Sequence, residues 1–345
     1  MSRLIKRATS LAARSLAFEK FVTLLEHADS QSPGLLRVLT YHRVDDPNTR
    51  PWLDPGLISA TPQAFDEQMK YLAAHYNVVS VKDVITAIET RASKDLPSRA
   101  VLVTFDDAYC DFEEHAWPIL KRHKLPATLF VPTAYPEQPE RTFWWDDLYQ
   151  AIHNNSQIDA LVTPIGILSL SNASRYQSYK RLINYLKTLR HSDTLTKVRQ
   201  YCNELDFHST TNSVLAWDSL RRLTKEGVTL GAHTRTHPLM NRIHFEEAQE
   251  EAIGSLHDLE REIGSALPIF AYPSGGFSDE VVAMLKREGF LLAFTTIRGI
   301  NNIKYIDPLR IRRINVGGRT TLPILRAQLL PWTVHLNRLQ TILDG

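Results

Sequence analysis

Val101-Leu-Val-Thr-Phe-Asp106-Asp107 is a short apolar run that ends abruptly in two adjacent carboxylates. A continuous run of apolar and β-branched residues is typical of a strand buried on both faces, as at the centre of a parallel sheet or barrel. Two neighbouring carboxylates repel each other, so each needs its own partner to stay ionised at modest cost. A metal ion would supply that partner for one of the two.

Suitable co-ligands stand much further along the chain, in Val228-Thr-Leu-Gly-Ala-His233-Thr-Arg-Thr-His237-Pro238. Here a second apolar run ends in two histidines four residues apart. Two neutral imidazoles and a carboxylate suit zinc or a similar divalent ion, with one position left open for water. No Glu follows His233, and Pro238 closes the segment, so this pattern differs from the helical zinc-protease motif.

The rest of the chain alternates short apolar runs with amphipathic stretches. Strands are predicted at Leu35 to His42, Val78-Val79, Val101 to Asp106, Ala127 to Val131, after Val228, Ile269 to Tyr272, Phe290 to Thr296 and Ile311 to Val316. About eight strands separated mostly by helices predict an α/β fold, a single (β/α) barrel that is either complete or distorted. In such a barrel the carboxyl ends of the strands share one rim, so His42, Asp106, Asp107, His233 and Tyr272 should converge there.

Two features modify this rhythm. A helix is expected from about Asp111 to Lys124, with Pro118 kinking or restarting it. Residues 136–215 interrupt the alternation with long helical patterns, and we interpret them as a mainly helical insertion within a barrel of residues 33–330. Residues 331–345 are assigned to a C-terminal tail.

The N-terminal segment, residues 1–32, is basic and amphipathic, since Met1 to Phe18 contains four basic residues and no acid. Arg14 divides the only apolar stretch, which disfavours a cleaved secretory signal, and no segment is long enough to cross a bilayer. Residues 1–25 suit peripheral contact with an anionic membrane surface, a transit peptide, or a terminal helix packed on the barrel. A cytoplasmic or membrane-peripheral location is the expectation.

The overall composition is that of an ordinary globular protein of 345 residues. Forty basic and 38 acidic residues give a formal charge of +2, which does not suggest a nucleic-acid partner. The two cysteines, Cys110 and Cys202, have neither the spacing of a metal site nor that of a disulfide framework.

Three segments together resemble the first three motifs of the polysaccharide deacetylases, the NodB-homology or carbohydrate esterase family 4 group. They are Thr104-Phe-Asp-Asp107, His233-Thr-Arg-Thr-His237-Pro and Phe270-Ala-Tyr-Pro-Ser-Gly275. The similarity covers roughly residues 35 to 316 and is greatest to variants with an early Tyr-His segment, here Tyr41-His42. The combination of motifs is specific, although each piece alone is not.

The resemblance implies a role for each motif residue. Asp107, His233 and His237 correspond to the metal ligands, with Zn²⁺ as the default and Co²⁺, Ni²⁺ or Fe²⁺ acceptable to the same set. Asp106 corresponds to the general base that takes a proton from water as it attacks an acetamide carbonyl. His42 corresponds to the general acid of relatives that act on poly-N-acetylglucosamine.

The chain also departs from the family pattern. The usual Arg-Pro-Pro-Tyr-Gly of the third motif is replaced by Ala271-Tyr-Pro-Ser-Gly275, which removes the Arg that orients the base. We expect Arg313 to substitute for it and the backbone N–H of Ser274 to contact the oxyanion. Members of the family commonly supply the general acid from a later Leu-x-x-x-His-like motif, and this motif is not found here. Ala108 stands where Gly is usual after the second carboxylate.

Substrate contacts are expected from aromatic side chains. Trp144 and Trp145 could stack on sugar rings, and adjacent Trp residues usually split, one toward the core and one outward. Tyr272 is a further candidate for substrate binding.

The expected function is metal-dependent removal of N-acetyl groups from an amino-sugar polysaccharide, oligosaccharide or glycolipid. Two alternatives stay open. A glycoside hydrolase is disfavoured because adjacent carboxylates cannot flank a sugar at the required separation. A non-catalytic carbohydrate-binding barrel would have no use for Asp106.

Overall fold

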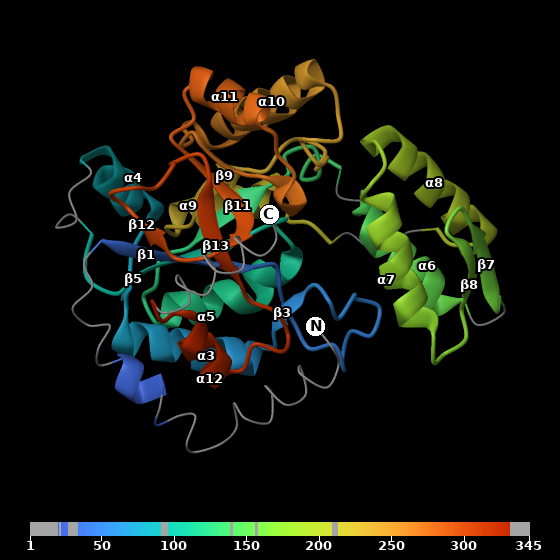
Figure 1. Cartoon of the computed structure of the whole chain (residues 1–345), viewed down its shortest axis with the longest axis horizontal. Coiled ribbons are helices and arrows are strands. Elements are labelled where there is room, and N and C mark those ends of the chain that lie inside the picture. The colour runs from blue at the N-terminus through green and yellow to red at the C-terminus, as the bar shows by residue number, and fades with distance from the viewer. Residues whose placement is uncertain are drawn as a thin grey trace.

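Seven parallel strands close into a barrel at the centre of the molecule (Figure 1). The computed structural model describes residues 20, 22–26, 34–90, 96–138, 141–155, 158–208 and 213–331. The ring runs in the order β1-β13-β11-β10-β9-β6-β5 and closes because β5 pairs with β1. The strands are β1 (Leu35–Tyr41), β5 (Ala100–Phe105), β6 (Thr128–Val131), β9 (Thr229–Ala232), β10 (Ile269–Ala271), β11 (Leu292–Arg298) and β13 (Ile311–Asn315). The predicted barrel is thereby confirmed.

The expected eighth strand lies outside the ring. β4 (Asn77–Val78) pairs only with the beginning of β5, at Ala100 and Val101. On the same edge of β5, the end of the strand pairs with β6. The other edge of β5 pairs with β1 along its whole length, so β4 lies outside the ring. All eight predicted strands are present, but a two-residue strand cannot complete a barrel, so seven of them form the ring. Two short pairings complete the strands around β1: β12 (Asn301–Asn302) runs antiparallel to it, and β2 (Arg43–Val44) pairs with β3 (Ile58–Ala60).

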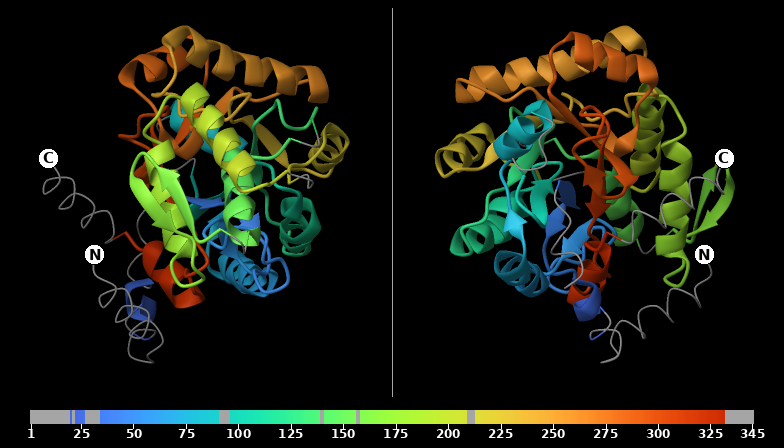
Figure 2. Two further views of the ribbon diagram at one scale, coloured as in Figure 1. Left: turned by 90° about the vertical axis from the view of Figure 1, so that its right-hand side faces the viewer. Right: turned by 60° about the vertical axis from the view of Figure 1, so that its left-hand side comes forward.

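Helices cover the outside of the barrel, as Figures 1 and 2 show from three directions. They are α3 (Pro62–His75), α4 (Val81–Thr90), α5 (Trp117–Arg122), α9 (Trp217–Lys225), α10 (Phe245–Ile263), α11 (Asp279–Arg287) and α12 (Leu322–Gln328). Their ends follow ordinary capping chemistry: the Thr61 hydroxyl accepts the N–H of Ala64 at 3.2 Å, and α10 ends at Gly264, whose φ is +79°. The apolar face of each helix is buried against the strands.

The helix predicted after the two carboxylates is interrupted where expected. Phe112–Ala116 forms a π-helical turn, and α5 then begins at Trp117 with Pro118 in its first turn. A proline lacks the N–H that would continue the preceding turn, but it is tolerated at a helix start.

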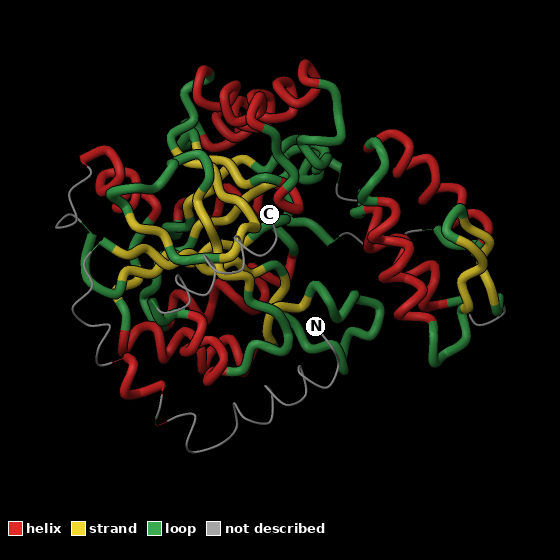
Figure 3. The backbone as a smooth tube through the Cα atoms, in the orientation of Figure 1, coloured by secondary structure: helices red, strands yellow, loops and turns green. Residues whose placement is uncertain are grey.

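Residues 144–204 contribute three helices and one hairpin. The helices are α6 (Trp144–Asn154), α7 (Arg175–Leu186) and α8 (His191–Glu204), and the hairpin consists of β7 (Ala160–Thr163) and β8 (Gly166–Ser169). These elements stand together at one side of the barrel (Figures 1 and 3). The hairpin was not predicted, because each of its strands has only four residues and the pair is partly exposed.

Arg43 joins these elements to the barrel through buried ion pairs. Its guanidinium lies 3.0 Å from Asp111, beside the π-helical turn, and 3.0 Å from Asp146 on α6. It also stacks 3.5 Å from the centre of the Tyr109 ring. Because all of these groups are buried, removing one partner would leave an uncompensated charge inside the protein.

The termini are described only in part. The predicted N-terminal amphipathic helix and most of the C-terminal tail lie outside the described residues. Glu26, which is described, pairs with Arg326 of α12 at 2.7 Å. Among the described residues, no helix has the length and apolar character needed to span a bilayer.

Candidate active site

The two adjacent carboxylates lie at the end of β5 and point to different partners. Asp107 adopts φ = +74° and Ala108 φ = +51°, so the backbone turns sharply just after the strand. Asp106 faces Arg313 of β13, whereas Asp107 faces the two histidines that follow β9. The repulsion expected from the sequence is thus relieved by separate partners.

Asp106 and Arg313 form a bidentate ion pair. Nη1 and Nη2 of Arg313 each donate to one carboxylate oxygen of Asp106, both at 2.8 Å, and Nε donates to the carbonyl of Thr295. Both side chains are buried. Burial alone would raise the pKa of Asp106, but Arg313 and His233 outweigh it, and the pKa lies below its ordinary value. Asp106 is therefore ionised at neutral pH.

Asp107, His233 and His237 form a compact buried cluster whose ligand atoms lie within 4.8 Å of one another. Oδ1 of Asp107 lies 3.3 Å from Nε2 of His233 and 3.2 Å from Nε2 of His237. Nδ1 of His233 lies 2.7 Å from the carbonyl oxygen of Ala271, so this nitrogen carries the hydrogen and Nε2 presents a lone pair.

These three residues fit a divalent cation. The buried Oδ1 of Asp107 has no hydrogen-bond donor aligned with it among the described residues. Burial is the main cause that lowers the pKa of His237, so its imidazole is neutral at pH 7, as a metal ligand must be. The pKa of His233 is raised, because the nearby carboxylates of Asp107 and Asp106 and the hydrogen bond to Ala271 outweigh burial. A proton and a cation would therefore compete for this cluster.

The loop that carries the histidines is fixed from α10. The backbone N–H groups of Arg235 and Thr236 donate to Oε2 of Glu251 at 2.7 and 2.8 Å. Arg235 also forms two hydrogen bonds of 2.8 Å with Asp258. His237 has φ = +61°, an uncommon conformation for a side chain of its size. The contacts with α10 hold this strained loop in place.

A cavity of about 110 Å³ opens onto the cluster. His42, Asp106 and Ser274 line it together with the three cluster residues. His42 follows β1 directly and donates its backbone N–H to the hydroxyl of Ser59 at 2.9 Å. The structure therefore brings together residues that lie more than two hundred positions apart in the sequence.

At the third motif, the turn Pro273–Gly275 places Ser274 at the cavity, in the position where the usual motif has a tyrosine. Ser274 has φ = +49° in the turn Pro273–Gly275. Gly275 has φ = +72°, and a Cβ there would lie 1.9 Å from Oγ1 of Thr296, so only glycine fits. Within the described part of the chain, the N–H groups of Gly275 and Gly276 have acceptors, but that of Ser274 has none.

Tyr272 does not reach the cavity. Its side chain is fully buried, and its hydroxyl donates to the carbonyl of Leu309 at 3.0 Å. Contact of Tyr272 with substrate therefore stays a prediction, which this buried position does not support. The reason is local: Tyr272 follows β10 with its ring packed between Phe270 and Phe277.

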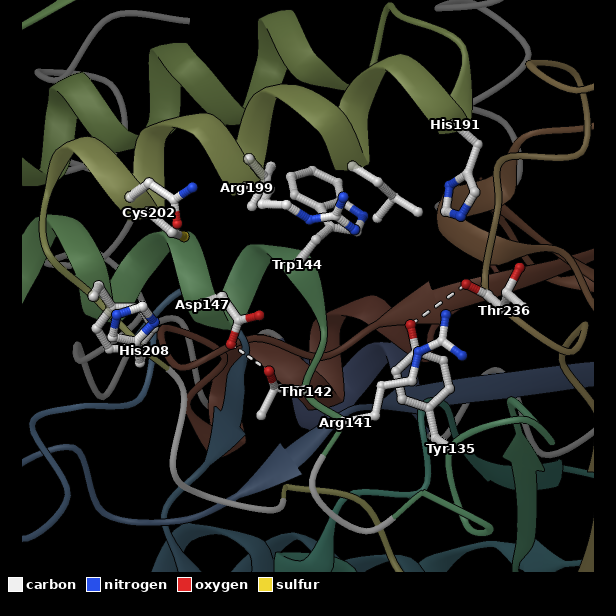
Figure 4. Close-up of a pocket in the computed structure, with 14 residues that line it drawn as sticks. Tyr135, Arg141, Thr142, Trp144, Asp147, His191, Arg199, Cys202, His208 and Thr236 are labelled. Carbon is white, nitrogen blue, oxygen red and sulfur yellow. Dashed lines mark hydrogen bonds between the residues drawn. The ribbon is translucent and has the colours of Figure 1, made fainter.

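The adjacent tryptophans line different pockets, but both side chains are buried, so neither points outward as one of them was expected to do. Trp145 lines the cavity, stacks on Phe143 at 4.4 Å and meets the ring of His237 edge-on at 4.7 Å. Trp144 lines a different pocket (Figure 4). Trp145 is therefore the one that faces the cluster.

Three charged residues of the cavity were not found from the sequence: Asp54, Lys180 and Lys187. Asp54 is buried and accepts hydrogen bonds from the hydroxyls of Tyr176 and Tyr179. Burial and the charge of Lys180 lower the pKa of Lys187. Asp54-Pro-Gly56 reads as an ordinary turn and the lysines as a solvated helix face, so no signal in the sequence distinguished them.

Comparison with known proteins places this geometry in context. The sequence profile of the family described as polysaccharide deacetylase matches residues 93–160 and 172–293. The chain is 19% identical over 271 residues to the putative polysaccharide deacetylase YxkH of Bacillus subtilis. The match covers 78% of this chain and 67% of that protein. It is 28% identical over 130 residues to the poly-β-1,6-N-acetyl-D-glucosamine N-deacetylase of Staphylococcus aureus, covering 32% of this chain and 43% of that enzyme.

Solved structures share the fold. The Streptococcus pyogenes deacetylase PplD, in complex with acetate, has a TM-score of 0.59 at 20% identity, covering 87% of this chain and 100% of that one. IcaB from Ammonifex degensii has a TM-score of 0.58 at 20% identity, covering 87% and 98%.

Proposed function

Because the chain belongs to the polysaccharide deacetylase family, we propose that it is a metal-dependent hydrolase that removes acetyl groups from the acetamido groups of an N-acetylated glycan. The observation that carries this proposal is the convergence in one cavity of the cluster Asp107, His233 and His237 with the Asp106–Arg313 ion pair. One part can hold a cation and the other is a base fixed in its ionised state.

Asp107, His233 and His237 would hold the cation, with Zn²⁺ as the first choice for two imidazoles and a carboxylate. When bound there, a divalent cation lowers the pKa of a water molecule and polarises a carbonyl oxygen. The hydrogen bond from His233 Nδ1 to Ala271 fixes this ring in the tautomer that coordination requires.

Asp106 would act as the general base. It accepts a proton from water as the water oxygen bonds to the acetamide carbon. Arg313 holds both carboxylate oxygens and keeps the group ionised, while it also makes Asp106 a weaker base than an isolated carboxylate. Arg313 thus positions the base in the role that the missing third-motif arginine has in other family members.

His42 would act as the general acid. Breaking the C–N bond releases acetate and an amine, and the amine nitrogen needs a proton as it leaves. His42 is the one histidine lining the cavity, apart from the two in the cluster.

The unpaired N–H of Ser274 would stabilise the oxygen that becomes negative during attack. A backbone donor needs no particular side chain, which explains why a serine can occupy this position. Trp145 lines the same cavity and offers an apolar ring edge to the sugar.

The substrate class that we propose is a polymer or oligomer of N-acetylglucosamine, supported by the relatives that act on poly-β-1,6-N-acetyl-D-glucosamine. The matched segment is less than half of the Staphylococcus enzyme, so the rest of that enzyme has no counterpart in this comparison.

The direct test is acetate release by protein reconstituted with Zn²⁺, Co²⁺ or Ni²⁺, assayed on N-acetylglucosamine polymers, short oligomers and lipid-linked sugars. We expect acetate in amounts equal to new free amines, and no new reducing ends. Reducing ends without acetate would identify a glycoside hydrolase. Tight sugar binding by metal-loaded protein without acetate release would identify a binding protein, and either outcome refutes the proposal.

A further inference from the structure

A second and larger pocket, of about 430 Å³, lies between α8, Tyr135 and residues 141–147 (Figure 4). We call it the α8 groove. Its volume falls in the range of roughly 300–1,000 Å³ that is usual for small-molecule sites. Figure 4 shows Arg199 of α8 on one side, Arg141 on the other, and Trp144 between the two walls.

The arginines of the α8 groove have no acidic partner. Among the described residues, no carboxylate lies within ion-pair distance of Arg141 or Arg199. Arg141 lies over the ring of Tyr135, 5.0 Å from its centre. The single carboxylate of the groove, Asp147, already accepts a hydrogen bond from the hydroxyl of Thr142. With two arginines and one carboxylate, the groove carries a net positive charge beside aromatic surface.

Two further polar side chains of the groove, His191 and Asn203, are suited to contacts with hydroxyl groups. Burial is the main cause that lowers the pKa of His191 to about 4. His191 is thus an uncharged donor and acceptor at pH 7. Asn203 adds an amide on the same wall.

The α8 groove adjoins the catalytic cavity. Thr236 lines the groove and stands directly before the cluster residue His237. The Tyr135 hydroxyl donates a hydrogen bond of 3.4 Å to the carbonyl oxygen of Thr236. Trp144 lines the groove while its neighbour Trp145 lines the cavity. A chain of linked sugars could therefore occupy both at once.

The catalytic cavity contains two lysines, Lys180 and Lys187, beside the carboxylates of Asp54, Asp106 and Asp107. Lys187 lines it, and no carboxylate of the described residues pairs with Lys187; Lys180 lies 3.9 Å from Asp54. Guanidinium groups match planar carboxylates and phosphates through paired hydrogen bonds.

We propose that the α8 groove binds an anionic sugar residue, bearing a carboxylate or a phosphate, that is linked to the unit being deacetylated. This inference rests on the proposed function and narrows its substrate to acidic glycans. Trp144 supplies the apolar surface for the ring, and Arg141 and Arg199 bind the acidic group.

The test measures binding separately from turnover. Calorimetric titration of the Asp106→Asn protein would use three tetrasaccharides: neutral N-acetylglucosamine, N-acetylglucosamine alternating with glucuronic acid, and N-acetylglucosamine bearing 6-phosphate groups. We expect at least one acidic compound to bind about tenfold more tightly than the neutral one, with an affinity that falls as salt rises. The stronger of the two identifies the acidic group.

Matched variants locate the effect. Arg141→Gln and Arg199→Gln should each remove most of the preference for the acidic compound and leave binding of the neutral one unchanged. Lys197→Gln is the control, because Lys197 lies on the same helix but does not line the groove. In the otherwise unaltered enzyme, the arginine variants should raise KM for the acidic substrate at constant kcat.

Equal binding of all three compounds, or a loss caused equally by Lys197→Gln, would overturn the assignment of the α8 groove. Acetate release from the neutral oligomer together with such a result would leave the proposed function intact. If the protein prefers the acidic compound but releases acetate from no substrate, the assignment of the α8 groove stands and the proposed function is refuted.

Discussion

The charged side chains of the barrel rim are paired with one another, whereas the arginines of the α8 groove stand without an acidic partner in the part of the chain that the structure describes. At the rim, Asp106 is held by Arg313 and Asp107 faces two histidines, all of them buried. In the groove, Arg141 and Arg199 have no acidic partner among the described residues. Groups that carry out a reaction must be fixed in one geometry, whereas groups that bind a charged substrate are best left unpaired until it arrives.

The origin of each region in the chain fits this division. The rim residues stand at the ends of barrel strands, where backbone pairing fixes their positions. The groove is built mainly from helices α6 and α8, outside the barrel. This arrangement lets the reaction stay constant while the selected substrate changes.

The largest expected effect breaks the rim itself. Asp107→Ala should abolish cation binding and activity together, whereas Asp106→Asn should retain the cation and lower kcat roughly 10³–10⁴-fold, because only the base is lost. Metal content by atomic absorption and acetate release are the two measurements. A variant pair in which both members stay active would refute the separation of roles.

Arg313→Met tests whether the rim charges depend on each other. It should lower the free energy of unfolding by on the order of 3–5 kcal/mol, since it leaves the buried Asp106 charge without a partner. Adding Asp106→Asn should restore most of this loss. Urea unfolding of the two single variants and the double variant gives the coupling energy, and additive effects would contradict the pairing.

His42→Ala sharpens the comparison by removing a rim residue that forms no ion pair among the described residues. We expect kcat to fall about 10²-fold with unchanged cation affinity, because the loss concerns only protonation of the leaving amine. His115→Ala, on the neighbouring π-helical turn and away from the cavity, is the control. If turnover is the same in both variants, the acid lies elsewhere.

Asp146 connects the two regions through Arg43 and gives the smallest effect. Burial raises the pKa of Asp146 from 3.8 to about 6, although Arg43 opposes the shift. The folded protein therefore keeps this proton to a higher pH than the unfolded chain does. Relative to Asp146→Asn, the native protein should lose stability as pH rises from 3.8 to about 6, by at most about 1.4 kcal/mol per pH unit. Urea unfolding at several pH values measures this, and a constant difference would contradict it.

Much of the rim could be predicted because strand ends are local features of sequence. The run Val101 to Phe105 identified a central strand, and the residues after it had to emerge at the rim. Arg313 was expected beside Asp106 on the same grounds, since it lies on the last strand of the ring. Tyr272 was expected at the rim because it ends a predicted strand, but position at a strand end does not decide whether a side chain faces the cavity or the core.

The α8 groove could not be predicted, because it depends on how separate helices pack. Arg199 alone looks like a solvated residue on a helix face, and Arg141 like part of a loop. Only their placement around Trp144 gives them a common surface. The β7–β8 hairpin was also missed, although Pro164 and Gly166 between two short apolar runs are a turn signal.

The segment that returns from α8 to the barrel is hydrogen-bonded to the loop after the catalytic carboxylates. The N–H of Leu215 donates to the carbonyl of Ala108, and the N–H of Cys110 donates to that of Ser213, both at 2.9 Å. Engineers who graft a foreign helical segment onto this scaffold to alter its sugar preference should therefore retain residues 213–215. A junction placed within them would disturb Asp107 even if the transplanted helices folded well.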